Sequence, residues 1–452
     1  MTVAEKRSLK SRVEHWEFCP EIYVYPTPRM YEPVSNFSYQ GLNLTDDLNV
    51  YVHVPFCKQF CSFCGYFKTI YTESLQSQFV DAVVKEIELR RGCFEGRTVK
   101  TLHFGGGTPS LLSPLELERI IQALIRVKPD ILDTSLEVSI EATPESIELD
   151  KFRGYRQAGI NRVSMGVQSL VDQEVVLANR CVESDRTSYQ MLSEAFETLR
   201  GIGVPDVVID LMIGIEGQTE ESFEESLRLA LTLKPETVQL YALGVMPQTA
   251  LGRRKPAKLM PGKKIYDCYE LGRRLFLQSG YNQDSHDRYT VHEGSGFLQG
   301  DYNIRGLSLI GLGAGSRSYS KDFHFRNTYA SLNGRKALEE YMQNMSRGRH
   351  SVESGVHLDL DEQSRQYAIG HIQALNGEEF ERRFGCSVEE KFGELYREML
   401  ELNLVTKEGP VWKLTPKGLL FRDLLGRQMF SARARWLEEA YRGGRSSKTI
   451  ET

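Results

Sequence analysis

The sequence predicts an α/β fold in which short buried strands alternate with amphipathic helices along 452 residues. Six runs of six to eight residues, most of them rich in Val, Ile, Leu or Tyr, are typical of buried parallel strands. These runs are NVYVHVP (49–55), VKTLHF (99–104), SLEVSIE (135–141), NRVSMG (161–166), VVIDLMIG (207–214) and TVQLYAL (237–243). Because helical patterns separate them, the order predicts either a right-handed α/β barrel or an open doubly wound sheet.

The helical patterns occupy residues 76–91, 114–126, 146–158, 187–202 and 220–233. Ser113 and Thr219 stand where N-caps are expected, and Gly159 and Gly203 stand where helices end. In both architectures the loops at the C-terminal ends of the strands gather at one edge. We therefore expect the chemistry beyond these strand ends.

The segments on either side of this alternation have a different pattern. Residues 1–48 include the Pro- and Tyr-rich stretch YVYPTPRMYEPV, which we expect to form an arm extended over the barrel. Residues 49–345 are the predicted barrel region, which includes the Gly-rich closing run IGLGAGSRSYS near its end. Residues 346–452 contain helical patterns and two short strands around a Gly-Pro turn, which predict a small winged-helix domain.

The composition and charge exclude several classes of protein. Apolar residues make up 40% and charged residues 26%, as in ordinary globular proteins. Lys plus Arg number 56 against 61 Asp plus Glu, which argues against a protein that mainly neutralises nucleic-acid phosphates. No apolar run approaches the ~18 residues that span a bilayer, and the first residues lack the apolar segment of a signal peptide. We expect a cytoplasmic monomer with no membrane or nucleic-acid partner.

Three of the eight cysteines lie within eight residues of each other. Cys57, Cys61 and Cys64 have the spacing C-x3-C-x2-C directly after the first predicted strand. Three thiolates on such a loop can hold three irons of a cubane cluster while the fourth iron keeps an open site. A structural zinc site is the alternative, but it requires four ligands, and neither His53 on the strand nor the remote Cys93 suits the fourth position. We expect the other five cysteines to bind no cluster.

With this motif the sequence resembles the radical S-adenosylmethionine (SAM) superfamily, and specifically its HemN-like branch, over about residues 50–430. The resemblance implies a partial (β/α)6 barrel with an N-terminal arm and a small C-terminal winged-helix-like domain. It also implies a [4Fe-4S] cluster whose open iron chelates SAM, which is then cleaved to a 5′-deoxyadenosyl radical. A small-molecule substrate and an external electron donor such as flavodoxin or ferredoxin are the implied partners.

The resemblance assigns residues near the first two strand ends to SAM. The loop GGGTP comes after the second strand, and in the family it binds the amino-acid part of SAM, which assigns Gly106, Gly107 and Thr108. Tyr51 shares one face of the first strand with His53. In the family the tyrosine lies against the SAM sulfonium, a cation that favours an aromatic face.

Further residues match family positions that contact the first SAM. Four of them are polar and lie at or just beyond successive strands: Glu141, Gln168, Arg180 and Asp210. Carboxylates suit ammonium or ribose hydroxyl groups, the guanidinium suits a carboxylate, and the amide suits a ribose. Looser matches assign Ala242 to the adenine side and Arg317 to a second SAM molecule. Each polar residue alone is typical of a surface or a satisfied core position, but together they favour a site.

The sequence departs from the coproporphyrinogen dehydrogenase subgroup of this branch. That subgroup reads C-x3-C-x2-C-x-C, whereas Tyr66 stands at the fourth position here, and the arm lacks a basic stretch for porphyrin carboxylates. The segment QDSHDRYTVHEGSG is also shorter than its counterpart. These differences favour the class C radical SAM methyltransferases and HemN-like cyclopropanases. In those relatives a second SAM donates a carbon to an sp2 carbon of a natural-product substrate.

The residue that handles the proton in such a reaction is chosen by position alone. Tyr66, His286 and Tyr289 are the candidates, because they come after the cysteine loop or the late strands. Tyr51 completes the predicted catalytic set.

Three alternatives remain open. The first is an oxygen-independent coproporphyrinogen III dehydrogenase or an anaerobic haem-processing enzyme. The second is a haem-binding protein on the same scaffold, for which nine histidines supply axial ligands without a signature. The haem chaperones of the branch begin almost at the cysteine loop, so the 48-residue arm argues against that relative. The third is a DNA-binding regulator, suggested by the C-terminal segment. The sequence does not identify the substrate.

Overall fold

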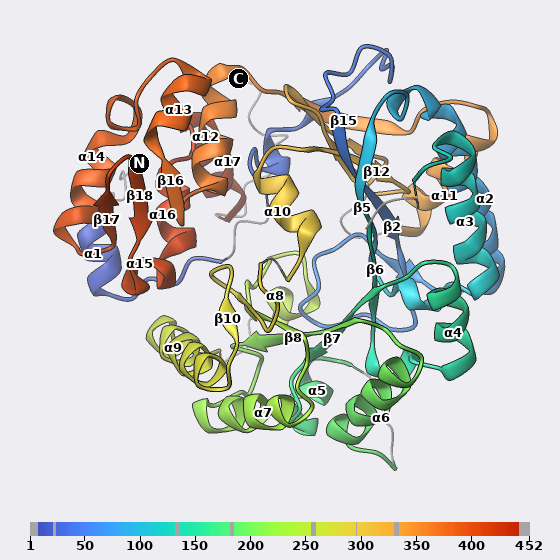
Figure 1. Ribbon diagram of the computed structural model, residues 1–452, viewed down its shortest axis with the longest axis horizontal. Coiled ribbons are helices and arrows are strands. Elements are labelled where there is room, and N and C mark those ends of the chain that lie inside the picture. Colours follow the sequence, from blue (N-terminus) through green and yellow to red (C-terminus); the bar gives the residue numbers. More distant parts are fainter. Residues whose placement is uncertain are drawn as a thin grey trace.

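The fold comes from a computed structural model of the chain, which describes residues 8–20, 24–131, 136–180, 185–254, 259–294, 296–329 and 334–442. Its largest feature is a mixed sheet of thirteen strands, in the order β1-β15-β14-β13-β12-β2-β5-β6-β7-β8-β9-β11-β10. Figure 1 shows the helices of the strand–helix units lying along the outer side of this sheet.

Seven neighbouring strands of the sheet run parallel. They are β12 (Ser308–Leu312), β2 (Asp47–Val54), β5 (Thr98–Gly106), β6 (Glu137–Ala142), β7 (Arg162–Gln168), β8 (Asp206–Ile213) and β9 (Thr237–Ala242). Six of these strands coincide with the six apolar runs, so the predicted α/β fold is confirmed. The seventh, β12, begins the Gly-rich closing run and pairs with β2.

Antiparallel strands extend the sheet at both edges. Beside β12 lie β13 (Arg317–Tyr319), β14 (Phe323–Asn327), β15 (Val352–His357) and β1 (Glu32–Pro33), and beside β9 lie β11 (Arg288–Thr290) and β10 (Asn282–Gln283). Among the described residues, β1 and β10 pair with no strand on their outer sides, so the two edges of the sheet do not meet. The barrel is therefore partial and not closed. Strand β15 lies beyond the boundary predicted at 345/346 and yet pairs with β14 in the large sheet.

Helices cover the five predicted helical patterns. They are α2 (Glu73–Leu89), α3 (Pro114–Val127), α4 (Leu149–Gln157), α6 (Ser188–Gly201) and α7 (Glu220–Thr232). The Ser113 and Thr219 hydroxyls accept hydrogen bonds from backbone N–H groups in the first turns of α3 and α7, as expected of N-caps. Gly159 and Gly203 come after α4 and α6 with φ of +109° and +74°, a conformation that favours glycine.

Shorter elements connect these units. They are β3 (Phe56–Cys57), β4 (Thr69–Ile70), α5 (Asp172–Leu177), α8 (Ala250–Arg254), α9 (Gly262–Gln278), α10 (Leu298–Ile304), α11 (Gly334–Ser346) and the 3-10 turns Arg91–Cys93, Pro109–Leu111 and Pro144–Ser146. The last of these turns ends at Ser146, where the helix was predicted to begin, and α4 itself begins three residues later, at Leu149.

The two faces of the parallel strands have different environments. On β2, Val50, Val52 and Val54 are fully buried in the same apolar cluster as Phe79 of α2. Because side chains alternate along a strand, Tyr51 and its neighbours on the other face point to the inside of the partial barrel. The apolar face stabilises the sheet against its helices and leaves the inner face for polar groups.

The C-terminal part of the chain combines helices with a small antiparallel sheet of order β16-β18-β17. Its elements are α12 (Leu360–Gly370), β16 (Ala374–Asn376), α13 (Gly377–Phe384), α14 (Val388–Glu401), β17 (Val405–Glu408), β18 (Val411–Leu414), α15 (Pro416–Leu420), α16 (Arg422–Gln428) and α17 (Ala432–Arg442). The hairpin after three helices has the predicted winged-helix-like form. No helix among the described residues is long and apolar enough to cross a membrane.

The N-terminal arm packs differently from the extended segment that we expected. It contains helix α1 (Leu9–Glu14), the 3-10 turn Pro28–Met30 and strand β1. Leu9, Val13 and Met30 belong to one apolar cluster with Phe421 and Leu425 of the C-terminal helices. Figure 1 shows α1 in blue beside the red and orange helices of that part. The arm therefore covers the C-terminal unit as well as pairing with the sheet, while the domain boundaries stay a prediction.

Candidate functional site

The three clustered cysteines lie on a loop at the C-terminal end of β2. Cys57 ends β3 and is buried, while Cys61 and Cys64 are half-buried in the segment that leads to β4. Cys57 pairs with Ile70 of β4, so the two ends of the loop lie side by side. The Ser62 N–H donates to the Ala178 carbonyl at 2.9 Å, which connects the middle of the loop to the segment after α5.

The surroundings of the thiols fit a soft metal cluster in their chemistry. Burial raises the pKa of the Cys57 thiol to about 12 and also raises that of Cys64, so metal binding must release these protons. Lys68 Nζ donates to the Cys64 carbonyl at 2.7 Å, and Arg180 Nη1 lies 3.5 Å from Cys61 Sγ. These two cations would offset the thiolate charge. In the described part of the chain, no three His, Cys, Asp or Glu side chains are already arranged around a metal position.

The glycine loop after β5 lies against the cysteine loop. Gly107 N–H donates to the Val54 carbonyl at 2.8 Å, and Thr108 N–H donates to the Phe56 carbonyl at 2.7 Å. A Cβ atom at Gly107 would come within 2.6 Å of the Phe56 carbonyl oxygen and 3.0 Å of Cys57 Sγ. Glycine is therefore required there by the close approach of the two loops, which places the predicted SAM-binding backbone beside the predicted cluster ligand.

Tyr51 and His53 form a hydrogen-bonded pair on the inner face of β2. His53 Nε2 lies 2.9 Å from the Phe67 carbonyl, which can only accept, so Nε2 carries the hydrogen and Nδ1 accepts from Tyr51 Oη at 2.9 Å. Burial lowers the pKa of His53, which agrees with a neutral ring. The pair thereby connects Tyr51 to the end of the cysteine loop.

Glu141 joins the ends of two strands. His103 Nε2 donates to Glu141 Oε1 at 3.1 Å, and the Gly106 N–H donates to Oε2 at 2.9 Å. Burial alone would raise the pKa of Glu141, but the His103 hydrogen bond and charge, together with Gly106, hold it below its usual value. The carboxylate therefore stays ionised beside the glycine loop, where an ammonium group can bind. The Tyr51 ring stacks on His103 with centroids 5.7 Å apart.

Asp210 and Arg180 approach the same inner face from later strands. Arg180 Nη2 donates to the Gly166 carbonyl at the end of β7, and Ser164 Oγ donates to Asp210 Oδ1 at 3.3 Å. Burial and the nearby Glu141 charge raise the pKa of Asp210 to about 7. Gln168 has φ of +70° at a break in the β7–β8 register. A non-glycine residue in this conformation stores backbone strain, which is common at functional sites.

Three other predicted residues lie near the C-terminal ends of the parallel strands. Ala242 ends β9 and is buried. Tyr66 and Arg317 are close enough to Tyr51 for their charges to act on its hydroxyl, and Tyr66 is 57% exposed. Arg317 comes after the turn that contains Gly313, where a Cβ atom would come within 2.6 Å of the His53 carbonyl. The closing run is thus packed directly against the end of β2.

Two predicted catalytic residues lie away from the cysteine loop. Tyr289 pairs with Val238 at the beginning of β9, because β11 runs antiparallel to it, and its ring stacks on Phe276 of α9 with centroids 4.7 Å apart. His286 lies between the edge of the sheet and the C-terminal unit, where its Nε2 is 3.7 Å from Asp423 Oδ2. Both residues were predicted from their position after the late strands, but neither side chain lies with the cysteines.

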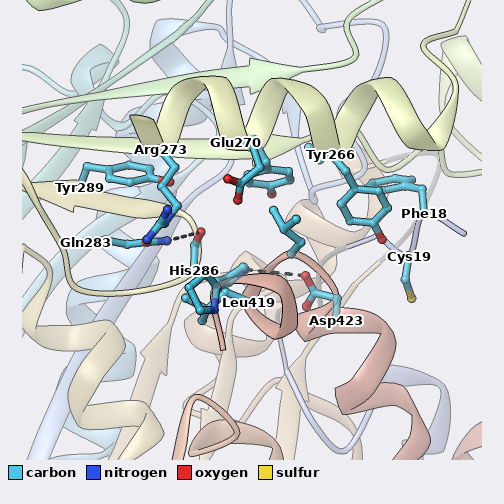
Figure 2. A pocket seen from close by; sticks show the side chains of 14 residues that line it. Phe18, Cys19, Tyr266, Glu270, Arg273, Gln283, His286, Tyr289, Leu419 and Asp423 are labelled. Atoms are coloured by element: carbon cyan, nitrogen blue, oxygen red, sulfur yellow. Dashed lines mark hydrogen bonds and ion pairs between the residues drawn. The ribbon is translucent and has the colours of Figure 1, made fainter. Parts of the chain in front are cut away.

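His286 and Tyr289 line a small pocket with a cavity volume of about 20 Å³. Figure 2 shows Tyr266, Glu270 and Arg273 of α9 along one side of this pocket and Asp423 of α16 on the other. Ala242 also lines it, so the pocket begins where β9 ends. We call it the interface pocket.

The sequence reasoning missed His103, which contacts Glu141 and Tyr51. A signal was present, because His103 stands two residues before Gly105 and so shares the inner face of its strand. Lys68 and Phe67 were missed as well. Their role depends on how the cysteine loop folds back, for which the sequence carries no periodic pattern.

Comparisons with known proteins agree with this geometry. The family model described as "Radical SAM superfamily" matches residues 51–230. Oxygen-independent coproporphyrinogen III oxidase of Escherichia coli (strain K12) is 30% identical over 336 residues, which are 71% of this chain and 70% of that protein. Heme chaperone HemW of the same organism is 30% identical over 276 residues, which are 60% of this chain and 69% of that protein.

A solved structure extends the likeness to the fold. Coproporphyrinogen III oxidase (HemN) from Escherichia coli, described as a radical SAM enzyme, superposes with a TM-score of 0.76 at 26% identity, over 90% of this chain and 96% of that one. The radical SAM family uses a [4Fe-4S] cluster and SAM, the two cofactors that the cysteine spacing and the glycine loop predict. From the cysteine loop, the strand-end residues and these matches, we conclude that the chain belongs to the HemN-like family of the radical SAM superfamily.

Proposed function

We propose that this radical SAM enzyme oxidises a propionate-bearing tetrapyrrole, as an oxygen-independent coproporphyrinogen III oxidase or a closely related haem-processing enzyme. One observation carries the proposal: similarity to a protein of that activity extends over 70% of its sequence and over 96% of a solved chain. The cluster and SAM together supply a 5′-deoxyadenosyl radical, which removes a hydrogen atom from the substrate.

The residues of the chain bind and orient SAM in this proposal. Cys57, Cys61 and Cys64 would hold the cluster, and the backbone of the glycine loop would bind the amino-acid part of SAM. The ionised Glu141 accepts from the SAM ammonium group, and the Arg180 guanidinium pairs with its carboxylate. The Tyr51 ring would face the sulfonium, while the hydrogen bond to His53 fixes the direction of its hydroxyl.

Carbon transfer from a second SAM is the other candidate for this site. It is favoured by Tyr66, which stands where the dehydrogenase subgroup has a fourth cysteine and which is exposed beside Tyr51. In that reaction the radical takes a hydrogen atom from the methyl group of the second SAM, and S-adenosylhomocysteine leaves after the carbon has been transferred.

One anaerobic experiment separates the two reactions. The reconstituted enzyme is given coproporphyrinogen III, a low-potential reductant and SAM with a trideuterated methyl group. Oxidation converts each propionate to a vinyl group with loss of CO2, of a hydrogen atom to the 5′-deoxyadenosyl radical, and of one electron to an electron acceptor that is added with the substrate. We expect that product, unlabelled 5′-deoxyadenosine, and methionine without S-adenosylhomocysteine.

The triple Cys→Ala variant at positions 57, 61 and 64 is the control and should give no product. Deuterium in 5′-deoxyadenosine together with S-adenosylhomocysteine would contradict the oxidase proposal and establish carbon transfer. Unchanged porphyrinogen with turnover of another unsaturated substrate would also count against it.

A further inference from the structure

Two arginines stand directly opposite each other at the edge of the candidate site. Arg317 of β13 pairs with Arg326 of β14 in the antiparallel register, so both side chains lie on the same face of the sheet. The next residue on each strand, Ser318 on β13 and Phe325 on β14, forms the neighbouring pair and points to the opposite face. On that face Ser318 Oγ accepts a hydrogen bond from Arg90. Like charges in directly opposite positions destabilise a sheet.

Arg317 has a hydrogen bond to Tyr319 on its own strand, and Arg326 has less to offset its charge. In the described part of the chain, neither guanidinium forms an ion pair with a carboxylate within 4.0 Å. Arg326 Nε is buried without a hydrogen-bond partner, and its Nη2 reaches only Ser354 Oγ at 3.4 Å. The nearest acidic influence on Arg326 is the exposed Glu353 on β15. An unsatisfied buried donor costs free energy, which a suitable acceptor would recover.

Aromatic residues complete the surroundings of the arginine pair. The Tyr329 ring lies under Arg326 with its centroid 4.0 Å from Cζ. Tyr31 comes from the N-terminal arm, and its Oη is buried without a hydrogen-bond partner. Both arginine charges act on the Tyr31 hydroxyl. A donor from the arm and two guanidinium groups therefore meet at one place.

This cluster adjoins the inner face of the barrel. The charge of Arg317 acts on both Tyr51 and His53. The arginine pair is thus positioned at the side of the predicted SAM site that the arm and the antiparallel strands form.

We propose that Arg317 and Arg326, with the hydroxyl of Tyr31, form a carboxylate-binding subsite. A carboxylate has two oxygens that can accept from a planar guanidinium pair and a third donor. The carboxylate comes from a substrate propionate or from SAM, and the first source rests on the proposed function. The cross-strand repulsion of the empty pair is offset when the anion binds.

The test uses the reconstituted holoenzyme and two pairs of probes. Coproporphyrin III and its tetramethyl ester differ only in free carboxylates, and SAM and decarboxylated SAM differ in the same way. Arg326→Gln removes the charge and keeps a hydrogen-bonding group. Tyr31→Phe removes only the hydroxyl. Arg335→Gln, at an exposed arginine paired with Glu339 on α11, is the matched control.

We expect Arg326→Gln to weaken coproporphyrin III binding about tenfold or more by fluorescence titration, with the ester unaffected. Tyr31→Phe should weaken it by a smaller factor, and the control should not change it. If SAM affinity falls instead while decarboxylated SAM is unaffected, the subsite holds the carboxylate of SAM. If neither free-carboxylate probe binds more weakly, the subsite does not exist.

Two further readouts keep folding and function separate. Without ligand, Arg326→Gln should leave the melting temperature unchanged or raise it, because it removes a like-charge pair; a large decrease would indicate a structural role and contradict the proposal. A wild-type enzyme that does not bind coproporphyrin III would count against the tetrapyrrole substrate. The subsite would then be judged by the two SAM probes alone.

Discussion

The candidate site at the ends of the parallel strands, called here the strand-end site, and the interface pocket both contain ionisable and aromatic side chains. The elements that bring these side chains together differ between the two. At the strand ends, His103, Glu141 and Gly106 come from neighbouring parallel strands and bond to one another. In the interface pocket, His286 comes from the segment before β11 and meets Asp423 of α16, across two parts of the chain. The first arrangement results from the sheet, whereas the second depends on how the C-terminal unit packs.

Because of this difference, we expect SAM to bind at the strand ends and not in the interface pocket. Parallel strands place all their C-terminal ends at one edge, so polar residues at those ends are near each other whatever the rest of the chain does. The interface pocket brings its groups together where α9, the segment before β11 and the C-terminal helices pack. We therefore expect changes at the strand ends to affect cofactor binding and changes in the pocket to affect it little.

The largest effect is expected from the cysteine loop. Replacing Cys57, Cys61 and Cys64 by alanine should reduce cluster iron after anaerobic reconstitution to about zero, because we propose their thiolates as the iron ligands. Alanine at Cys93, Cys268 and Cys386, which lie outside the loop, should leave the iron content unchanged. A normal cluster spectrum in the loop variant would contradict the assignment.

Asp210→Asn should change how stability depends on pH. The pKa of Asp210 is raised from 3.8 to about 7, so its contribution to folding is most favourable below pH ~4 and is lost as the pH rises to about 7. The variant avoids that loss. Its gain in free energy of unfolding over the wild type should grow with pH by ~2–4 kcal/mol and level off above pH ~7. Chemical denaturation at several pH values measures this, and a pH-independent difference would show that the pKa of Asp210 is the same in the folded and unfolded states.

Arg180→Ala should weaken SAM binding by about 10- to 100-fold, because a hydrogen bond to a charged group contributes about 1.5–3 kcal/mol. Anaerobic calorimetry on the holoenzyme measures the affinity. Cluster iron must be determined in parallel, since Arg180 also lies near Cys61. Unchanged SAM affinity with a full cluster would remove Arg180 from the SAM site.

The smallest effect is expected in the interface pocket. His286→Gln removes the contacts of the ring nitrogens with Asp287 Oδ1 at 3.4 Å and Asp423 Oδ2 at 3.7 Å, and should lower stability by at most about 1 kcal/mol. SAM affinity and cluster content should stay within about twofold of the wild type. A variant that binds SAM normally and yet loses turnover would instead show that the interface pocket takes part in catalysis. The functional difference that we expect between the two regions would then be wrong.

Much of the fold was predictable from periodic patterns. The strands and helices of the barrel coincide with the apolar runs and helical patterns, because each is buried on a surface that repeats along the chain. The arm was not predictable in the same way. Leu9 and Val13 show no pattern that identifies the C-terminal helices as their partner.

The residues of the candidate site also differ in how far the sequence predicts their positions. Tyr51, Glu141 and Asp210 were predicted from their places near the ends of parallel strands, and the structure brings them to one edge because parallel strands end there together. His286 and Tyr289 were chosen by their position after a late strand, but β11 runs antiparallel and turns them toward α9 and α16. The pairing of Arg317 with Arg326 depends on the register of β13 and β14, which sequence periodicity does not fix.

The packing of the arm also determines the order in which the chain can fold during synthesis. The N–H of Lys10 donates to Glu398, 388 positions later, and β1 pairs with β15. The arm therefore waits for partners that are synthesised up to 388 positions later, while the strands that carry the cysteine loop already have their neighbours. A ribosome-bound chain that ends near residue 330 would have these strands and an unplaced arm, so protease should cut the arm first. Addition of the C-terminal unit is the step that should protect it.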